Sequence, residues 1–365
     1  MQPSLQQGAV TGGWTGPIID ADVHVNLPSV DVLLPHLGGQ WIEWIGETGF
    51  TVPGSLQTKY PAGSSITCAP EWRPADGRMP ASDLSMLRED VLDPLGVEFA
   101  IANCYWGLDS LRNPDFTLAL ARAINDWLIE GWLDRDERLR ASLIVPSHNP
   151  ADAAAEIDRV GGHPGFVQVF LPLWSPIPYG NRTWWAMWEA IVRNDLVAGI
   201  HYGGSSEGPT STTGWATWFI EEYAGAIAMS WQQLTSILGE GLFQRFPTLR
   251  VSLLEGGFSW LGPFLWRLDK EWKGLRREIP WVDRLPSQIF REHLRFSIQP
   301  IGAGPPEGFA RVVDWLGSDE LLMFASDYPH GHEQSVATVL DVLPETARPK
   351  LMSENARAHY RLGDG

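Results

Sequence analysis

Cysteine is nearly absent from this chain, which has only Cys68 and Cys104 among its 365 residues. The two are not spaced as CxxC and make no disulfide framework, so the small disulfide-stabilised secreted folds are excluded. The chain lacks a run of about 18 consecutive apolar residues, the length that a membrane-spanning helix needs. Residues 1–16 lack the charged and apolar regions of a signal peptide. These absences predict a cytoplasmic protein that does not bind a membrane.

Basic residues are also in short supply. Lys and Arg total 27 against 44 Asp and Glu, which gives a formal net charge of −17. A protein this acidic repels nucleic acid and anionic lipid, and we expect neither as a partner. A small-molecule substrate of either charge remains open, because a metal ion can reverse the potential inside a pocket.

Tryptophan, in contrast, is abundant, with 19 residues. A large core and subunit interfaces account for such a number, and a substrate pocket lined by aromatic rings needs only a few of them. We therefore expect an oligomer, formed either by copies of this chain or with a related subunit.

Short apolar runs alternate with longer amphipathic stretches, which is the pattern of parallel strands joined by helices. The eight runs are Pro17–Val25, Val97–Asn103, Arg140–Val145, Phe166–Leu171, Leu196–His201, Arg250–Leu254, Leu294–Ile298 and Leu321–Ala325. The helical stretches between them include Phe116–Trp132, Ala151–Val160, Trp184–Arg193 and Phe258–Trp272. This alternation predicts a closed (β/α)8 TIM barrel of the α/β class, with a large open doubly wound sheet as the alternative.

The spacing of the runs predicts helical insertions after strands one and five. The first insertion has a helical piece near Asp31–Ile45 and a Pro- and Gly-rich loop from Pro53 to Pro80, and the second has a long helix around Trp215–Leu238. No internal repeat or low-complexity tract divides the chain. We therefore predict an N-terminal extension over residues 1–16 and one barrel domain over residues 17–365.

Side chains that can bind a metal follow several of the predicted strands, at the ends where barrel enzymes carry their reactive groups. Asp22 and His24 close the first run, and strand alternation places both on the inner face. His201 ends the fifth run, Glu255 follows the sixth, and Asp327 follows the eighth. Because these strand ends meet at one mouth of the barrel, we expect the side chains to converge there.

Each of these residues also has a purely structural interpretation. A turn or a helix cap would account for Asp22, Glu255 or Asp327, and a histidine that ends an apolar strand, such as His201, is often an ordinary core residue. Taken together, buried carboxylates crowded at one mouth would lose several kcal/mol of hydration each without a counter-charge. A divalent cation removes that penalty, so the combination favours a metal site.

The mixture of imidazole and carboxylate ligands suits zinc, iron or manganese better than calcium or magnesium, which prefer oxygen ligands. We expect one zinc ion, with iron or manganese as the alternative metals and two ions as the alternative number. His330, three residues after Asp327, is a candidate ligand, hydrogen-bond donor or acid. His332 is expected to be solvated, and His148 either to reach the pocket or to lie on a surface turn.

Five segments together resemble the amidohydrolase superfamily, in particular its branch of aminocarboxymuconate semialdehyde decarboxylase and related metal-dependent decarboxylases and hydrolases. They are Ile18–His24, His201, Phe246–Gly257, Ser326–His330 and Glu354–Leu362. The resemblance covers most of the chain and matches these segments to the family's first strand, strand-five histidine, strand-six segment, strand-eight aspartate motif and closing helix.

The chain departs from the family pattern at two of these positions. Asp22 stands where the commonest first-strand motif has a histidine, and Glu255 stands where a histidine often acts as base or ligand. The fourth run, with Gln168 and Phe170, offers no lysine. The bridging carbamylated lysine of many binuclear relatives is therefore not expected.

The leading hypothesis is a metal-dependent hydrolase or nonoxidative decarboxylase that acts on a small carboxylated or carbonyl substrate through a metal-activated water. Asp22, His24, His201 and Asp327 would hold the metal, with Glu255 as a further ligand or base. Asp327, Glu255 and His330 are the predicted catalytic residues. The alternatives are an iron or manganese oxygenase built on the same fold, and a noncatalytic paralogous subunit of a metalloenzyme complex.

Overall fold

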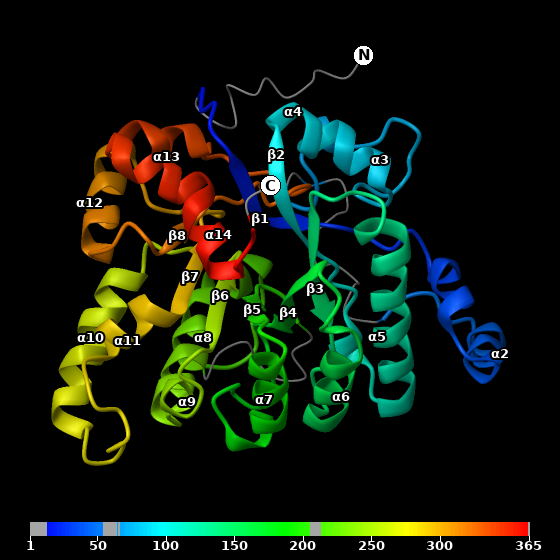
Figure 1. Cartoon of the computed structure of the whole chain (residues 1–365), viewed down its shortest axis with the longest axis horizontal. Helices are drawn as coiled ribbons and strands as arrows, with labels where there is room; N and C mark the ends of the chain where they lie inside the picture. The colour runs from blue at the N-terminus through cyan, green and yellow to red at the C-terminus, as the bar shows by residue number, and fades with distance from the viewer. Residues whose placement is uncertain (1–12, 54–63, 65, 205–212, 364–365) are drawn as a thin grey trace.

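Eight parallel strands form one barrel in the computed structural model, which describes residues 13–53, 64, 66–204 and 213–363. The strands follow one another in chain order around the sheet, as Figure 1 shows. Their bounds are β1 Ile18–His24, β2 Val97–Asn103, β3 Leu139–Ile144, β4 Phe166–Pro172, β5 Val197–His201, β6 Arg250–Leu254, β7 Leu294–Ser297 and β8 Leu322–Met323.

The segment that follows β8 returns to β1 and closes the barrel. The amide of Ala21 donates to the carbonyl of Phe324 at 2.9 Å, and the amide of His24 donates to the carbonyl of Tyr328 at 2.7 Å. Val23 and Tyr328 form a parallel bridge. The predicted TIM barrel is therefore confirmed, and the open-sheet alternative is wrong.

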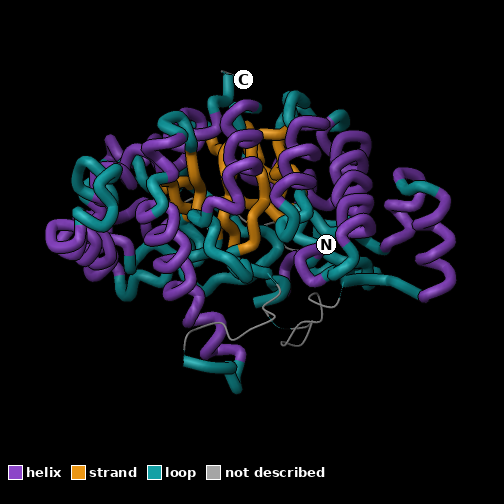
Figure 2. The backbone as a smooth tube through the Cα atoms, turned by 90° about the horizontal axis from the view of Figure 1, so that it is seen from below, coloured by secondary structure: helices purple, strands orange, loops and turns teal. Residues whose placement is uncertain are grey.

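Helices surround the strands, as Figure 2 shows with the strands in orange at the centre. The helices are α2 Gly39–Thr48, α3 Leu84–Leu87, α4 Asp93–Leu95, α5 Pro114–Leu128, α6 Pro150–Val160, α7 Trp185–Arg193, α8 Phe219–Gly239, α9 Leu242–Arg245, α10 Leu261–Leu275, α11 Pro286–His293, α12 Pro306–Leu316, α13 Val336–Val342 and α14 Asn355–Tyr360.

Two of the outer helices begin at an Asn-Pro pair. The side chain of Asn113 accepts from the amide of Phe116 at the start of α5, and the side chain of Asn149 accepts from the amides of Ala151 and Asp152 at the start of α6. The proline that follows each cap has no N–H to leave unsatisfied in the first turn. Because of these caps, α5 and α6 each begin before the first residue of the helical stretch predicted from the sequence.

The two predicted insertions are present, but their details differ from the sequence pattern. The stretch Asp31–Ile45 is not one helix, because Pro35 lies in a 3-10 turn over Val30–His36 and α2 begins only at Gly39. The long helix of the second insertion is α8. Residues 54–63, 65 and 205–212 of these insertions, and residues 1–12 of the N-terminal extension, lie outside the described residues.

Helix α14 covers the N-terminal end of the barrel, opposite the mouth. A guanidinium nitrogen of Arg250, the first residue of β6, donates to the carbonyl of His359 in α14. Side chains of α14 and the residues after it pack with strand residues in a buried cluster. Its members are Ile19, Ala21, Phe99, Ile101, Val197, Met323, Ala356, Tyr360 and Leu362.

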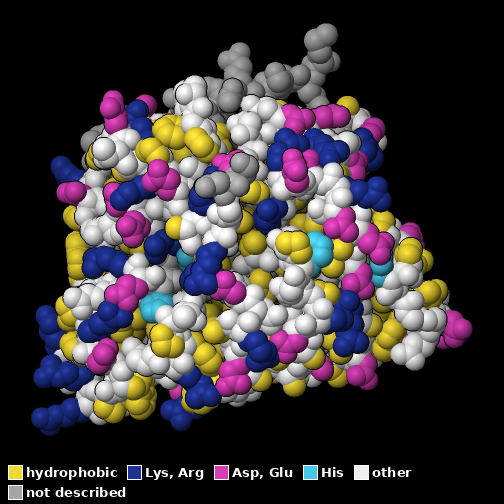
Figure 3. All heavy atoms as spheres, viewed as in Figure 1, with side chains coloured by type: hydrophobic (Ala, Val, Ile, Leu, Met, Phe, Trp, Pro, Cys, Tyr) yellow, Lys and Arg dark blue, Asp and Glu magenta, His cyan; other side chains and the backbone are white. Residues whose placement is uncertain are grey.

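The surface features of the protein leave the predicted oligomer and the predicted cytoplasmic location untested. On the face drawn in Figure 3, basic side chains are interspersed with acidic ones. Exposed apolar side chains on α8 include Ile220, Ile227 and Trp231. In the described part of the chain, no helix combines the length and hydrophobicity that a bilayer crossing needs. The predicted oligomer and the cytoplasmic location stay predictions.

Because His359 is buried, we expect the protein to lose stability in mild acid. Burial, with Arg295 and Arg250 nearby, holds the pKa of His359 well below its usual value. The unfolded chain therefore takes up this proton first as the pH falls from about 6.5. The stability from neutral His359 is present above that pH and declines below it by up to about 1.4 kcal/mol per pH unit.

Urea unfolding of the metal-free protein between about pH 7 and pH 5 measures this decline. A His359→Gln variant keeps an N–H donor but cannot titrate, so its unfolding free energy should fall less steeply over the same range. Equal slopes for the two proteins would show that His359 is not the residue responsible.

Candidate metal centre

The ends of β1 and β5 and the turn after β8 bring four side chains together at the barrel mouth. Nε2 of His24 lies 3.0 Å from Oδ1 of Asp327 and 3.8 Å from Oδ1 of Asp22. Nε2 of His201 lies 3.3 Å from Oδ2 of Asp22. These contacts link Asp327 to His24, His24 to Asp22, and Asp22 to His201, although the four residues are separated by up to 305 positions (327 − 22) in the sequence.

Glu255 and His330 lie at the same site. Potential ligand atoms of His24, Glu255, Asp327 and His330 are all within 4.8 Å of one another, and Asp22, His24 and His201 form a second such group. The rings of His24 and His330 meet edge to face with centroids 4.6 Å apart. The two groups share His24, so the residues form one continuous site rather than two.

Two of the site residues adopt a backbone conformation that costs free energy. Glu255 has φ 54° and Asp327 has φ 57°, in the left-handed region that residues with a side chain rarely occupy. Such a residue costs about 1–3 kcal/mol and persists only where its surroundings fix it. Here Ser297 Oγ accepts from the amide of Glu255 at 2.9 Å, and the carbonyl of Asp22 accepts from the amide of Asp327 at 3.0 Å.

Unpartnered buried atoms test whether a cation fits this site. Among the described residues, neither Oδ2 of Asp22 nor Nε2 of His201 has a hydrogen-bond partner. Nδ1 of His201 lies 2.6 Å from the carbonyl of Tyr202, which can only accept, so Nδ1 carries a hydrogen and Nε2 is the nitrogen that faces Asp22. An imidazole nitrogen and a carboxylate oxygen that face each other suit a divalent cation between them, which takes the place of the imidazole proton.

The pKa values of the site reflect its crowding. Burial lowers the pKa of His201, but Asp22 and Glu255 outweigh that effect and raise it to about 9. Burial and the charge of Asp327 raise the pKa of Glu255 well above its usual value. Burial would also raise the pKa of Asp327, but His330, His24 and His332 hold it well below its usual value. These carboxylates therefore depend on positive charge beside them.

The prediction for His332 is wrong, because this residue is not solvated. Its Nε2 lies 2.7 Å from Oδ2 of Asp327, and its side chain is only 13% exposed. The amide of His330 donates to the carbonyl of Asp327, so the chain turns back over the mouth and carries His332 with it. His148 lies on an exposed turn, where its ring bonds to the backbone carbonyl of Asp109.

Two polar residues that support the site were not singled out from the sequence. Oδ1 of Asp20 accepts from the amides of Asp22 and Ser326, at 3.2 and 3.0 Å, and so joins β1 to the turn that carries Asp327. Burial raises the pKa of Asp20 to about 7. Asn103 donates to Asp22 at 2.7 Å. The sequence feature that could have identified both residues is a polar side chain at an inward-facing position of an otherwise apolar strand.

Aromatic rings line one side of the mouth next to these residues. Phe170 stacks on His201 with centroids 5.1 Å apart, and Tyr202 meets Tyr223 edge to face at 5.0 Å. Tyr223 also reaches Glu255, with its hydroxyl 3.5 Å from Oε1. The rings of this aromatic wall are Tyr105, Phe170, Trp174, Tyr202, Phe219 and Tyr223.

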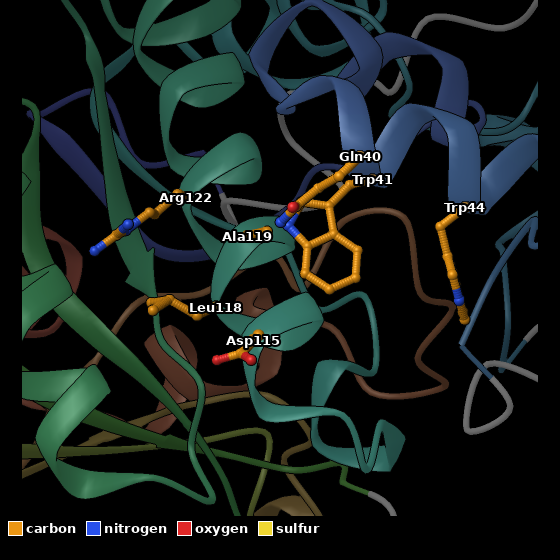
Figure 4. Close-up of a pocket in the computed structure, with 7 residues that line it drawn as sticks. All are labelled: Gln40, Trp41, Trp44, Asp115, Leu118, Ala119 and Arg122. Atoms are coloured by element: carbon orange, nitrogen blue, oxygen red, sulfur yellow. The ribbon is translucent and has the colours of Figure 1, made fainter.

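The aromatic wall contains two buried donors without a partner among the described residues, the hydroxyl of Tyr202 and Nε1 of Trp174. A buried donor without a partner costs about 1–3 kcal/mol, so such groups need an explanation. Both residues come just after strands that end at the mouth, Trp174 after β4 and Tyr202 after β5. By contrast, the pocket of about 570 Å³ between α2 and α5, drawn in Figure 4, lies on the outside of the barrel and is lined by Trp41, Trp44 and Arg122 among others.

Comparison with known families now identifies the chain. Residues 19–362 match the family model described as amidohydrolase. This chain belongs to the amidohydrolase family. The match confirms the resemblance inferred from the sequence, and together with the decarboxylases to which the chain is similar it identifies the protein as an enzyme. The family also accounts for the position of the site at the C-terminal mouth of the barrel.

Curated relatives of this amidohydrolase include proteins named gamma-resorcylate decarboxylase. The protein from Polaromonas sp. (strain JS666) is 24% identical over 299 residues, which cover 77% of this chain and 88% of that protein. The protein from Rhizobium radiobacter is 24% identical over 344 residues, which cover 87% and 97%.

Solved structures with the same fold include two aromatic-acid decarboxylases. The 5-carboxyvanillate decarboxylase of Novosphingobium aromaticivorans, in complex with manganese, has a TM-score of 0.71 at 18% identity, with 98% of this chain and 100% of that chain covered. A 2,6-dihydroxybenzoate decarboxylase in complex with 2,6-dihydroxybenzoate has a TM-score of 0.68 at 19% identity, with 95% and 100% covered. At these identities the likeness supports the barrel fold.

Proposed function

We propose that this amidohydrolase is a metal-dependent nonoxidative decarboxylase of an aromatic carboxylic acid. The observation that carries the proposal is the position of the aromatic wall directly against the cluster of imidazoles and carboxylates, with Phe170 stacked on His201. Flat rings suit an aromatic substrate, and the cluster suits a cation beside it. The curated relatives named gamma-resorcylate decarboxylase support the same chemistry.

In this proposal Asp22, His24, His201 and Asp327 hold the ion, and Glu255 is a further ligand or a base. A single ion is favoured because both candidate groups depend on His24, and its Nε2 binds one metal. The ligand types alone favour zinc, but the manganese in the related 5-carboxyvanillate decarboxylase makes manganese the first metal to test for this chain. Imidazoles suit zinc and carboxylates suit manganese, so a site that contains both is compatible with either ion.

The side chains would orient the substrate and supply the proton. When bound, the cation would polarise a substrate oxygen and lower the pKa of a coordinated water. The aromatic wall would hold the substrate ring, and the Tyr202 hydroxyl and Trp174 Nε1 would donate to oxygens on that ring. As the bond to the carboxylate breaks and carbon dioxide leaves, the ring carbon must receive a proton. We propose Glu255, whose pKa is raised, as the donor of this proton, with His330 and Asp327 as the other predicted catalytic residues.

Hydrolysis is the second candidate function, and the position of Glu255 favours it. Its carboxylate lies 3.9 Å from Nδ1 of His201 and within 4.8 Å of the other ligand atoms in its group, where it could take a proton from an attacking water. Hydrolysis would place oxygen from water labelled with ¹⁸O in the organic product, whereas decarboxylation would leave the phenol product without the label. An oxygenase would instead consume dioxygen during turnover.

The proposed function is tested by loading the purified protein with Mn²⁺ or Zn²⁺ and supplying carboxylated phenols. Candidates are 2,6-dihydroxybenzoate and 5-carboxyvanillate, the compounds in the relatives' names. We expect release of carbon dioxide and formation of the corresponding phenol from at least one aromatic acid. If a broad panel of aromatic acids gives no carbon dioxide with either metal, while an ester or amide is hydrolysed, the decarboxylase proposal is wrong.

Replacing Tyr202 by phenylalanine should separate binding from stability. The hydroxyl has no partner among the described residues, so its loss should leave the unfolding free energy unchanged or raise it by about 1 kcal/mol. If the hydroxyl donates to the substrate, kcat/KM should fall by about 10-fold. Steady-state kinetics and urea unfolding measure the two effects.

Tyr179 provides the matched control, because its hydroxyl is buried but donates to the carbonyl of Pro172 at 2.9 Å. Tyr179→Phe should lose stability and keep kcat/KM within about 2-fold, the reverse of Tyr202→Phe. A Tyr202→Phe variant with lowered stability and unchanged kinetics would remove Tyr202 from the substrate site.

A further inference from the structure

A line of buried polar side chains runs through the interior of the barrel and ends on Asp22. Nδ2 of Asn103 lies 2.7 Å from Oδ1 of Asp22, and the hydroxyl of Ser142 lies 2.5 Å from Oδ1 of Asn103. Nε2 of Gln168 lies 2.7 Å from the Ser142 hydroxyl. The line therefore crosses β1, β2, β3 and β4 in turn.

The same line continues to the opposite end of the barrel. The hydroxyl of Tyr360, in α14, lies 3.0 Å from Oε1 of Gln168. Ser252 on β6 lies 3.2 Å from that hydroxyl and 3.1 Å from Nε2 of His359. We call this set the interior chain, and its members are His359, Ser252, Tyr360, Gln168, Ser142 and Asn103.

The chemistry of the groups fixes the direction of every hydrogen bond in the interior chain. A carboxylate only accepts, so Asn103 must donate through its amide nitrogen and accept through its oxygen. Ser142 donates its one hydroxyl hydrogen to Asn103, so its oxygen must accept from Gln168. Gln168 in turn accepts from Tyr360.

The remaining two bonds follow from the same count of hydrogens. Tyr360 donates its hydroxyl hydrogen to Gln168, so its oxygen accepts from Ser252. The Ser252 oxygen in turn accepts from the N–H of His359. Each donor therefore points toward Asp22. Hydrogen bonds aligned in this way strengthen one another in a buried environment of low dielectric.

The backbone leaves room for the interior chain. A Cβ atom at Gly199 in β5 would lie 2.3 Å from Cδ of Gln168, a distance that no pair of such atoms tolerates. Glycine at this position therefore makes space for the Gln168 side chain. All members of the interior chain are buried, with exposures between 0% and 5%.

We propose that the interior chain positions Asp22 for the metal ion, an inference that rests on the proposed metal centre. It occupies Oδ1 of Asp22 and so fixes the rotation of the carboxylate. Oδ2 is then left facing Nε2 of His201 at 3.3 Å, with no hydrogen-bond partner among the described residues. Asn103, Ser142, Gln168 and Tyr360 are positioning residues, which act on the ion through Asp22.

A purely structural role would give a different result from this proposal. If the interior chain only satisfied polar groups in the core, breaking it would lower the stability of the fold but would not change the affinity for metal. If it positions Asp22, the affinity should fall, and it should fall most when the break is nearest to Asp22.

The experiment measures the dissociation constants of Mn²⁺ and Zn²⁺ by competition with a chromogenic chelator. Residues that orient a metal ligand typically contribute 10- to 100-fold in affinity, so Asn103→Leu should weaken binding by about that factor. The bonds farther along act only through Asn103, and we expect about 3- to 10-fold for Ser142→Ala and about 2- to 5-fold for Tyr360→Phe.

Tyr179→Phe is the matched control, because it also removes a fully buried tyrosine hydroxyl that donates a hydrogen bond, but one outside the interior chain. Its metal affinity should stay within about 2-fold of the parent protein. Thermal unfolding of the metal-free variants records how much each substitution costs the fold itself.

The possible results separate the two proposals. A parent protein that binds neither ion overturns the metal centre and this inference with it. A parent protein that binds metal, with Ser142→Ala and Tyr360→Phe variants that bind it as tightly as Tyr179→Phe, overturns the positioning role alone. Those two variants carry the test if Asn103→Leu does not fold.

Discussion

Replacing Asp327 by alanine is expected to lower kcat/KM by about 10³-fold or more and to leave the purified protein without its metal. Asp327 is fully buried, and both of its carboxylate oxygens face imidazoles, with His24 at 3.0 Å and His332 at 2.7 Å. Its loss removes a ligand and leaves two histidines without a hydrogen-bond partner on Asp327. Steady-state kinetics and elemental analysis of protein purified without added metal measure the two effects.

Asp136 supplies a control for the loss of a buried carboxylate. It is bound by Arg88 and Arg138 just before β3, at the end of the barrel opposite the mouth. Asp136→Ala should lower the unfolding free energy by about 1–3 kcal/mol while metal content and kcat/KM stay near those of the parent protein. An Asp327→Ala variant that keeps both metal and turnover would exclude Asp327 from the centre.

Removal of the metal is expected to abolish turnover and to lower the melting temperature. A ligand at 100 times its dissociation constant stabilises the native state by about 2.7 kcal/mol. For a chain of this size that free energy corresponds to a shift of about 3–6 °C. Scanning calorimetry before and after chelation measures the shift, and addition of Mn²⁺ or Zn²⁺ should restore both stability and turnover.

A His201→Ala variant provides the control for chelation. His201 offers its unpartnered Nε2 to the centre, so a protein without it should already have lost most of its bound metal. Chelation should then change its melting temperature by less than about 1 °C. If the chelator destabilises this variant as much as the parent, the metal that it removes lies elsewhere.

The barrel could be predicted from the sequence because its strands are short apolar runs buried on both faces. The predicted runs Val97–Asn103 and Arg250–Leu254 match β2 and β6 at both ends. The predicted helix boundaries were less accurate where a turn outside the hydrophobic periodicity sets the first residue of the helix. The stretch Phe258–Trp272 became α10 at Leu261–Leu275, because Phe258 to Trp260 form a turn whose carbonyls accept the first bonds of the helix.

The convergence of the candidate ligands was predictable for a similar reason. Parallel strands in a barrel end at one mouth, so a polar residue directly after a strand has a known position in space before its contacts are known. Asp22, His24, His201, Glu255 and Asp327 lie together as this rule implies. Their roles as ligands and catalysts remain the proposal that the experiments above address.

Contacts within the interior and along the turns could not be predicted in this way. Asn103 and Asp22 are 81 residues apart, and Tyr360 and Gln168 are 192 residues apart. A lone serine or amide inside an apolar strand does not reveal which residue it will meet. His332 was expected to be solvated, whereas the turn after Asp327 brings it back to the site.

The most direct measurement is anomalous diffraction from crystals of the protein loaded with Mn²⁺. The account predicts one strong peak at coordination distance, about 2.0–2.2 Å, from Oδ2 of Asp22, Nε2 of His201, Nε2 of His24 and a carboxylate oxygen of Asp327. A map in which these four groups surround no peak, while the protein is fully active, would contradict the central claim.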